Sequence, residues 1–254
     1  MGPYPLTCLG ADSDLEAGLA QLAAAGMVSV TLVTDGLVGP GEDALRRAFP
    51  VARPFKSHYV VDPGTGPYAP SRHHRQELRR AGRSGVEVGI VRLRDHLDGW
   101  RALYNDLIAR HGIRGVQQFG AASFDALTAC PGLVAVAGFL GGELVCCHLW
   151  FEFGDKAWSH LAASSAAGYA NGAAYAVYDH SIRHFAGRIV NLGGAAGAGD
   201  RPEDDGLARF KSGFANRTIV AGLYGAVLDA PAYALLCAQR GDADSAYFPA
   251  YRAP

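Results

Sequence analysis

The chemistry most readily recognised in this chain belongs to one lysine. Lys211 lies between Phe210 and Phe214, with Gly213 before the second ring, at the end of the stretch "NLGGAAGAGDRPEDDGLARFKSGF". An ammonium group that aromatic rings partly remove from water is a strong hydrogen-bond donor for a developing oxyanion or a phosphate. A surface lysine whose aliphatic stem rests on the same rings would show the same pattern, so the residues alone leave both interpretations open.

A histidine offers a second candidate group. His160 lies in an expected strand that leads into a loop of small residues, where it could act as a general base, although a hydrogen-bonded core histidine has the same signature. His180 and His184 are four residues apart on an expected helix, but no third ligand can be placed beside them, and we expect no metal site. Neither Ser164 nor Ser165 lies in a G-x-S-x-G elbow, so a serine triad is not supported.

The run "SSAAGYANGAA", residues 164–174, leads from that strand into the next expected helix. Free backbone N–H groups at a helix N-terminus, together with the helix dipole, can bind a phosphate or a carbonyl oxygen. The same small residues would also allow tight packing of the backbone. The candidate donor-binding residues in this run are Ser164, Ser165, Gly168, Asn171 and Gly172.

A basic cluster precedes these elements. The arginines and histidines between positions 72 and 83 include Arg72, Arg75 and Arg79, which are candidate contacts to the phosphates of a nucleotide, of coenzyme A or of RNA. A solvated helix face is the alternative interpretation. The formal net charge of −1 argues against a protein coated in nucleic-acid-binding charge but allows a local patch.

The glycines at 193, 194, 197 and 199 suggest a dinucleotide-binding loop, which their spacing excludes. A G-x-G-x-x-G fingerprint needs a third glycine three positions after the second, whereas the sequence after Gly199 is Asp-Arg-Pro. No G-x-x-x-x-G-K-[ST] run is present either. We therefore expect Gly193 and Gly194 to end a strand and to let the chain turn.

Length and composition describe a folded globular protein. The 254 residues can bury a large core, 49% of them are apolar, and no apolar run reaches the length of about 18 residues that a membrane span needs. The N-terminus shows no basic segment followed by an apolar one, so no secretory signal is expected. Five cysteines without a repeated C-x-x-C pattern support neither a disulfide framework nor a zinc site. We expect a cytoplasmic protein that does not bind a membrane.

Hydrophobic periodicity and turn residues predict an α+β arrangement. The expected helices are residues 14–25, 42–48, 71–85, 97–111, 124–130 and 170–185. The expected strands are 28–33, 57–62, 86–93, three antiparallel strands over 133–163 with turns at 141–142 and 154–155, then 188–194, and a last strand or hairpin over 217–228. A soft boundary is expected between residues 63 and 94.

Several of these segments, in this order, resemble the Fem-type branch of the GNAT acyltransferase superfamily, the peptidoglycan-bridge aminoacyltransferases and their shorter relatives. The resemblance is carried by "LYNDLIARHG", "AGFLGGELVCCHLWFEFGDKAWSHLAAS", "AAYAVYDHSIRHFAG", "IVNLGG" and "DGLARFKSGFANR". The most specific part is Gly-Leu-x-x-Phe-Lys-x-x-Phe, residues 206–214. "RQELRRAGRSGVEV" resembles the family's basic helix, and the resemblance covers residues 70–240.

The resemblance implies a GNAT-like fold with a mixed, largely antiparallel central sheet flanked by helices. It divides the chain into a reduced N-terminal GNAT-like portion, residues 1–70, and a Fem/GNAT-type acyltransferase domain, residues 71–254. The implied activity is acyl transfer to an amine, which gives an amide by direct attack without an acyl-enzyme. Lys211 would stabilise the tetrahedral oxyanion or hold a phosphate, and His160 or the donor itself would handle the proton.

Two donors fit the resemblance. Ordinary GNAT enzymes hold the pyrophosphate of acetyl-CoA with an [Arg/Gln]-x-x-Gly-x-[Gly/Ala] loop, and the Arg/Gln position falls here on Ser165 or Tyr169. This departure favours aminoacyl-tRNA, bound by its acceptor end, as the co-substrate, with acetyl-CoA as the alternative. No further cofactor is implied.

The implied acceptor is a small amine or a short peptide, as in antibiotic and other natural-product biosynthesis, because the shortened N-terminal part lacks much of what the family uses for a large precursor. The candidate substrate-binding residues are Tyr104, Trp150, Asn191 and Phe210. A degenerate GNAT fold that serves only as a binding module is the non-enzymatic alternative. Its sign would be a tightly packed 164–172 loop together with a Lys211 side chain in open solvent.

Overall fold

The computed structural model describes residues 6–115, 118–194, 206–240 and 246–253. The chain divides into two compact units: His58–Thr218 is one, and Gly2–Ser57 combines with Ile219–Pro254 to form the other. This division differs from the boundary predicted at residue 70. The reason is the pairing of β1 (Ser29–Thr34) with β8 (Arg217–Val227), which joins the last part of the chain to the first.

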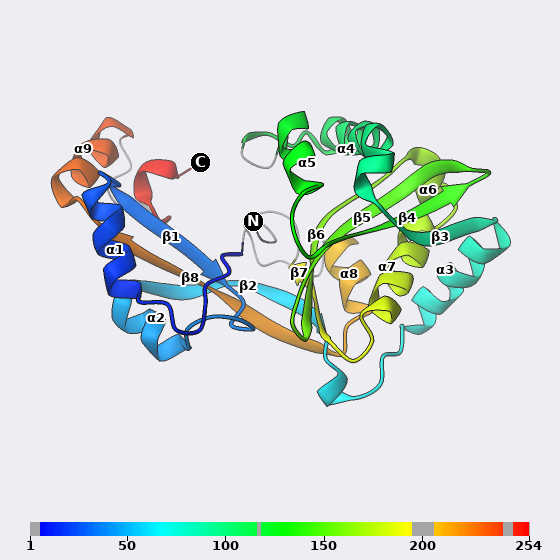
Figure 1. Cartoon of the computed structure of the whole chain (residues 1–254), viewed down its shortest axis with the longest axis horizontal. Coiled ribbons are helices and arrows are strands. Elements are labelled where there is room, and N and C mark those ends of the chain that lie inside the picture. Colours follow the sequence, from blue (N-terminus) through cyan, green and yellow to red (C-terminus); the bar gives the residue numbers. More distant parts are fainter. Residues whose placement is uncertain (1–5, 116–117, 195–205, 241–245, 254) are drawn as a thin grey trace. The chain divides into compact units, whose positions relative to one another are not determined.

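Within the described residues, eight strands are hydrogen-bonded in the order β1-β8-β2-β7-β6-β5-β4-β3 (Figure 1). The strands not yet introduced are β2 (Val51–Val61), β3 (Val86–Val91), β4 (Leu133–Leu140), β5 (Glu143–Phe153), β6 (Lys156–Ser164) and β7 (Ile189–Gly194). The pairs β1–β8, β2–β7, β3–β4, β4–β5 and β5–β6 are antiparallel, and β6–β7 is parallel. The mixed, largely antiparallel sheet predicted from the sequence is therefore confirmed.

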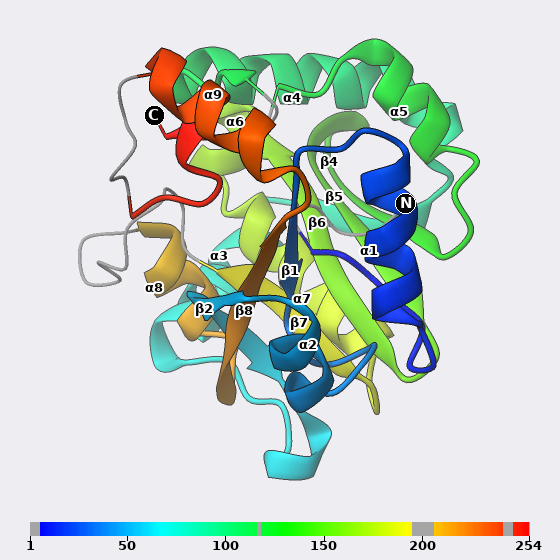
Figure 2. The same ribbon diagram turned by 90° about the vertical axis from the view of Figure 1, so that its left-hand side faces the viewer.

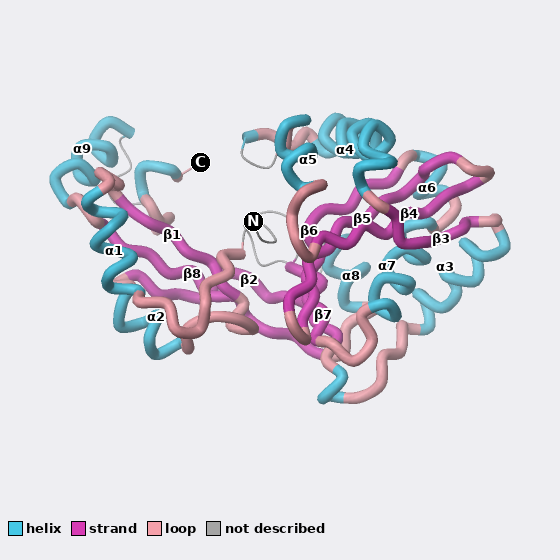
Figure 3. Tube along the Cα trace, viewed as in Figure 1, coloured by secondary structure: helices cyan, strands magenta, loops and turns pink. Residues whose placement is uncertain are grey.

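Helices cover both faces of the strands in the His58–Thr218 unit (Figures 1 and 2). One face carries α3 (Arg72–Arg83), α7 (Ala173–His184) and α8 (Gly206–Ser212), and the other carries α4 (Leu97–His111) and α5 (Ala121–Leu127). The short helix α6 (Ala166–Ala170) follows β6 directly. In Figure 3 the strands of this unit lie between the two groups of helices.

Alternation along β5 explains why each face has its own core. His148 and Trp150 point to the α7 side, where Trp150 packs with Tyr178 and Phe185. Leu149 and Phe151, which alternate with them along β5, point to the α4 side. The core on that side includes Trp100, Leu103, Tyr104, Phe124, Leu149 and Phe151. All of these side chains are at most 5% exposed.

The antiparallel strands β4, β5 and β6 follow the predicted meander. Their first turn is Gly141-Gly142, with φ values of 59° and 85°, the left-handed conformation that a two-residue hairpin loop requires at both central positions. The predicted helix over residues 97–111 is also present, and it ends at Gly112, whose left-handed conformation lets its N–H bond to the carbonyl oxygen of Ile108.

The other unit contains α1 (Leu15–Ala24), α2 (Glu42–Ala48), α9 (Ala230–Arg240) and a 3₁₀ turn at Ala250–Arg252. Its core is smaller and is built around Leu32, Leu45, Phe49 and Tyr224. Asp14 caps α1 by accepting a hydrogen bond from the N–H of Ala17, so the helix begins where the sequence predicts.

Several predicted elements differ from the structure. The single helix predicted over 170–185 is interrupted at Gly172, whose φ of 70° ends α6 and begins α7. The predicted helix 124–130 is α5, which begins and ends three residues earlier. No helix was expected at α8 or α9. Gly193 and Gly194 end β7, as predicted, whereas Gly197, Gly199 and the 200–205 loop lie outside the described residues.

Candidate active site at the separation of β6 and β7

The parallel strands β6 and β7 pair over only a short distance. Their register consists of Lys156↔Ile189, Ala157↔Val190 and Trp158↔Asn191. Beyond this point β6 continues for residues 159–164 without β7 as a partner, and β7 continues to Gly194 on its own pairing with β2. Among the described residues β7 does not pair with β6 beyond Trp158, and backbone groups without a strand partner can hydrogen-bond to a ligand. At the end of β6 the Arg110 side chain donates to the carbonyl oxygen of Ser164.

A β-bulge lies at the same place. Leu149 pairs with Leu161 and Trp150 pairs with Ser159, so His160 is the extra residue between them. A bulge redirects the side chains next to it. The His160 ring lies beside the rings of Phe119 and Phe151, on the α4 and α5 face.

Lys211 is on α8, on the opposite face of the sheet from His160. Its side chain is only 8% exposed, and Nζ donates a hydrogen bond of 2.7 Å to the carbonyl oxygen of Gly194. A Cβ atom added to Gly193 would lie 3.1 Å from Nζ, and Gly193 has a φ of 78°. The two glycines at the end of β7 therefore let the backbone pass close to the ammonium group.

Helix α8 is held in place by aromatic rings. Phe210 and Phe214 pack against Tyr175 and Tyr178 of α7, with ring centroids 4.8 to 6.2 Å apart, and against each other at 5.2 Å. These contacts explain the spacing of the Phe-Lys-x-x-Phe motif. The two phenylalanines are four residues apart, so their rings lie on the same side of the helix and are buried together. Lys211 follows Phe210 directly, and its ammonium group reaches the carbonyl oxygen of Gly194.

His74 of α3 fixes the same helix from the other side. Its Nε2 lies 2.7 Å from the carbonyl oxygen of Phe210 and its Nδ1 lies 2.9 Å from the hydroxyl of Ser71. The ring sits so close to the backbone that a Cβ on Gly213 would be 2.0 Å from Cε1 of His74. Burial lowers the pKa of His74, against a smaller raising effect of the bond to Phe210.

Asn191 shapes the end of β7. It is 1% exposed, its Nδ2 lies 3.1 Å from Nδ1 of His58, and its Oδ1 accepts a hydrogen bond of 2.8 Å from the N–H of Gly193. Asn191 thus holds the backbone of Gly193 in the conformation that borders Lys211. Its predicted role as a substrate contact stays a prediction.

A buried polar group lies on the Lys211 face of the sheet. His148 is 1% exposed, and its Nε2 lies 2.9 Å from the hydroxyl of Ser159, the first residue of β6 beyond the β7 pairing. Tyr178 stacks on His148 with centroids 4.5 Å apart. Burial lowers the pKa of His148 well below its usual range, and the positive charge of Lys211 acts in the same direction.

The predicted donor-binding run folds onto β5. The Ser164 hydroxyl, 4% exposed, donates to Sγ of Cys146 at 3.1 Å. Ser165 caps α6 by accepting a hydrogen bond from the N–H of Gly168, at whose position a Cβ would lie 2.3 Å from the carbonyl oxygen of Val145. Asn171 donates to the carbonyl oxygen of Ala167. These polar groups thus have partners within the fold.

Gly172 and the basic helix α3 lie side by side. A Cβ on Gly172 would be 3.5 Å from the Arg80 guanidinium, which pairs with Glu77 at 2.9 Å. The predicted phosphate contacts Arg72, Arg75 and Arg79 are exposed on this helix, and Arg75 donates to the carbonyl oxygen of Pro70. The basic cluster is therefore a solvent-facing helix surface in the same unit as Lys211.

Two predicted substrate contacts are core residues. Tyr104 is 2% exposed in the α4 core and Trp150 is 0% exposed in the α7 core. The structure gives both of them packing contacts. Phe210, the fourth predicted substrate contact, belongs to the aromatic seat of α8.

His160 and Lys211 face opposite sides of the sheet, so the structure does not bring the two predicted catalytic residues together. Burial lowers the pKa of His160 to about 4, and its Nδ1 has no hydrogen-bond partner among the described residues. A histidine with that pKa is a weak base at neutral pH. The interpretation as a core histidine, left open by the sequence, agrees better with these surroundings.

Sequence reasoning missed Ser159, His148 and His74. Ser159 and His148 meet only because the bulge at His160 sets the register of β6 on β5, and a bulge has no reliable sequence signal. For His74, the signal was present: Ser71 precedes it by three residues in the pattern of a helix N-cap, which predicts the helix start that places the ring.

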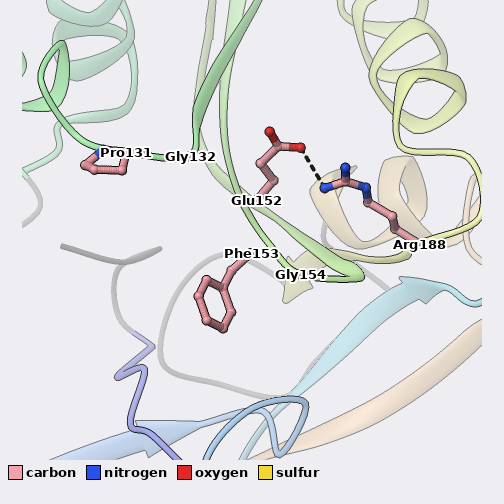
Figure 4. Close-up of a pocket in the computed structure, with 6 residues that line it drawn as sticks. All are labelled: Pro131, Gly132, Glu152, Phe153, Gly154 and Arg188. Carbon is pink, nitrogen blue, oxygen red and sulfur yellow. Dashed lines mark hydrogen bonds and ion pairs between the residues drawn. The ribbon is translucent and has the colours of Figure 1, made fainter.

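A surface pocket of about 380 Å³ lies elsewhere (Figure 4). It is lined by Pro131, Gly132, Glu152, Phe153, Gly154 and Arg188, and Glu152 forms an ion pair of 2.7 Å with Arg188. Gly154 and Arg188 precede the first paired residues of β6 and β7, whereas Lys211 lies at the far end of β7. The pocket contains none of the predicted site residues.

In the part of the chain that the structure describes, no three side chains of His, Cys, Asp or Glu come together in a way that could hold a metal ion. Across the same residues, none of the helices combines the length and the apolar character that crossing a membrane requires.

Known protein families and structures were compared with the chain. No family model matches it, and no curated protein matches it. Among solved structures, FemX is similar with a TM-score of 0.61 and 15% identity, over 87% of this chain and 79% of that chain. The C-terminal domain of a putative lysylphosphatidylglycerol synthetase from Agrobacterium fabrum has a TM-score of 0.58 and 19% identity, over 78% and 69%.

The structure of L-PGS from Bacillus licheniformis is also similar, with a TM-score of 0.52 and 15% identity. The match covers 68% of this chain and 61% of that one. At these identities the likeness establishes the fold. The fold predicted from the sequence, which is shared with FemX, is therefore confirmed.

Proposed function

We propose that this chain is an acyltransferase that joins an amino acid from aminoacyl-tRNA to the amine of a small molecule or short peptide. The observation that carries the proposal is the Lys211 ammonium, 8% exposed and held beside the end of the β6–β7 pairing. A fold shared with FemX supports it. Charged tRNA is a cytoplasmic metabolite, so we place the protein in the cytoplasm.

The proposed reaction needs one charged donor at the carbonyl oxygen. The acceptor amine attacks the ester carbonyl carbon, a C–N bond forms, and the carbonyl π electrons move to oxygen. The oxyanion then collapses, the C–O bond to the tRNA ribose breaks, and the proton lost by the amine goes to the leaving oxygen. Lys211 stabilises the oxyanion, and the loss of one such donor costs about 10²–10³ in rate.

The packing of residues 164–172 supports tRNA over coenzyme A as the donor. A pyrophosphate loop needs free N–H groups, but the N–H of Gly168 donates to the Ser165 hydroxyl. The backbone of Gly168 also lies so close to Val145 that a Cβ atom there would be 2.3 Å from the Val145 carbonyl oxygen. The exposed arginines of α3 provide a surface for phosphates of an RNA backbone instead. Coenzyme A remains the alternative donor.

The binding-module alternative predicts a packed 164–172 segment and a lysine in open solvent. The segment is packed, but Lys211 is 8% exposed and bonded to a main-chain carbonyl. Burial of a charge costs folding free energy, and charged groups buried at that cost are typical of functional sites, which favours an enzyme.

The proposed acceptor is a small amine, of the kind used in natural-product assembly. The name lysylphosphatidylglycerol synthetase, carried by one structural neighbour, describes an aminoacylated lipid, so a lipid hydroxyl belongs in any acceptor panel. The oxyanion chemistry of Lys211 is the same for both acceptors.

The deciding experiment supplies each donor separately. The purified protein is incubated with a pool of radiolabelled aminoacyl-tRNA or with acetyl-CoA, together with amines, short peptides and phosphatidylglycerol vesicles. We expect an RNase-sensitive product from the tRNA pool and an amide in that product. A product formed only with acetyl-CoA would exclude the tRNA donor, and no product with either donor would exclude the transferase.

A further inference from the structure

Ser159 occupies a distinctive place in β6. It is the first residue after the Trp158↔Asn191 pairing, and it is half-buried, whereas the residues before it are buried. Its hydroxyl lies 2.9 Å from Nε2 of His148, whose ring stacks on that of Tyr178. A buried histidine therefore holds the serine hydroxyl at the point where the strands separate.

The direction of these hydrogen bonds follows from the surroundings of His148. Its Nδ1 is buried and has no partner among the described residues, and an N–H there would be an orphaned donor. The favoured neutral tautomer carries its proton on Nε2, which donates to Ser159. The serine oxygen then accepts from His148, and its own O–H is left to donate elsewhere.

We propose that Ser159 is a catalytic residue of the transfer reaction, whose O–H donates a second hydrogen bond, beside Lys211, to the oxyanion that forms on the acyl carbonyl. His148 is a positioning residue that acts through Ser159, and Tyr178 stacks on the His148 ring. This inference rests on the proposed function. It adds no covalent step, because the amine proton still passes to the leaving oxygen and Ser159 keeps its own.

The arrangement of the sheet supports this assignment. Ser159 and His148 lie on the face that carries α7 and α8, where Lys211 is found, whereas His160 lies on the other face. Lys211 Nζ bonds to the carbonyl oxygen of Gly194, three residues along β7 from the Asn191 that pairs with Trp158, the residue before Ser159. Among the described residues, β6 has no β7 partner beyond Trp158, and the proposed position of the acyl carbonyl is beside this part of β6.

A serine beside a histidine also suggests a nucleophile, and the structure argues against it. A nucleophilic serine needs a base that accepts its proton. His148 is buried, its pKa lies well below the usual range, and a neighbouring positive charge disfavours its protonation further. Ser159 is therefore suited to donate a hydrogen bond and not to attack.

Kinetics of matched serine variants test the role. We expect Ser159→Ala to lower kcat by about 10²–10³ with little change in KM, and Ser159→Thr to recover part of the loss because it keeps the hydroxyl. Ser181→Ala removes another buried hydroxyl, which donates to the carbonyl oxygen of Val177, and should leave kcat near wild type. If wild type transfers the acyl group and Ser159→Ala does so within twofold of its rate, the inference is wrong and the proposed function stands.

A second measurement does not depend on activity. Nitrogen-15 NMR of the histidine rings, with the His148 signals assigned by their loss in His148→Gln, should show the proton on Nε2 at pH 7. Ser159→Ala should shift the Nε2 signal, while Ser181→Ala should not. A proton on Nδ1 would mean that Ser159 donates to His148, and the inference would be overturned even in an active enzyme. A protein with no transferase activity but an Nε2 proton would refute the proposed function and the catalytic role together.

Discussion

The Lys211 side chain is charged and buried, so we expect its replacement to affect turnover much more than stability. Loss of its hydrogen bond to Gly194 costs folding free energy, whereas removal of a charge that is 8% exposed returns some. We expect Lys211→Met to change the melting temperature little and to lower kcat by about 10²–10³. Lys156→Met, which breaks an ion pair with Asp155 at 2.6 Å, is the control that should keep full turnover. Near-normal turnover of Lys211→Met would remove it from the mechanism.

Buried histidines make stability depend on pH. Burial lowers the pKa of His160 from about 6.5 to about 4, so between these values the unfolded chain binds a proton that the native chain does not. The stabilisation is complete above pH 6.5 and is lost as the pH falls, by up to about 3 kcal/mol from this residue. His160→Phe should flatten the fall in the free energy of unfolding, measured by urea titration between pH 7 and 4. Parallel curves for the two proteins would contradict the assignment.

At the residue scale, the sequence predicted the lysine better than its partners. Phe210 precedes Lys211 directly and Phe214 follows it three residues later, so local spacing was enough to identify the aromatic surroundings of the lysine. The contact between His148 and Ser159 depends on which residue of β6 faces which residue of β5. A single bulged residue sets that register, and no sequence pattern identifies the bulge.

Helix α8 is the element on which the position of Lys211 depends. Gly213 gives the His74 ring its place, and a Cβ there would lie 2.0 Å from Cε1. We expect Gly213→Ala to destabilise the fold by about 1–3 kcal/mol, typical of overpacking, and to lower turnover because the helix must move. Gly206→Ala, at the start of the same helix, meets no atom of the described residues within 4 Å and is the matched control. Equal stability of both variants would show that His74 does not fix α8.

The elements that sequence patterns predicted well are those with strong local signals. The β4–β6 meander has long apolar strands and glycine turns, and it is present as predicted. Helix α8 has only seven residues and gains its stability from tertiary ring contacts, so local propensity does not reveal it. The break at Gly172 was missed because one glycine inside an alanine-rich helical pattern gives a weak signal.

At the scale of the whole molecule, the partition into units depends on a pairing between the two ends of the chain. Ser29 pairs with Val227, a contact that no local pattern predicts. The division at residue 70 followed the extent of the family resemblance along the chain, so it differs from the structural division His58–Thr218. The fold class depends less on this pairing, and it was predicted correctly.

Charge distribution over the whole molecule gives the last prediction. The net charge is −1, so binding to tRNA must rest on a local surface, and the exposed Arg72 and Arg79 of α3 are its proposed centre. Each phosphate contact contributes about 0.7–0.9 to the slope of log affinity against log salt concentration. The double variant Arg72→Gln/Arg79→Gln should therefore weaken tRNA binding at low salt and reduce the slope by about 1–2.

The double variant Arg46→Gln/Arg47→Gln on α2 changes the net charge equally and serves as the control. Both variants make the molecule more negative, so a purely global charge effect would weaken tRNA binding by the same factor in each. A slope reduced only by the α3 variant, measured by filter binding between 50 and 200 mM salt, would assign the RNA contact to α3, because screening by salt acts on the local phosphate contacts. Equal slopes in the two variants would remove α3 from the donor site and leave coenzyme A as the donor to test.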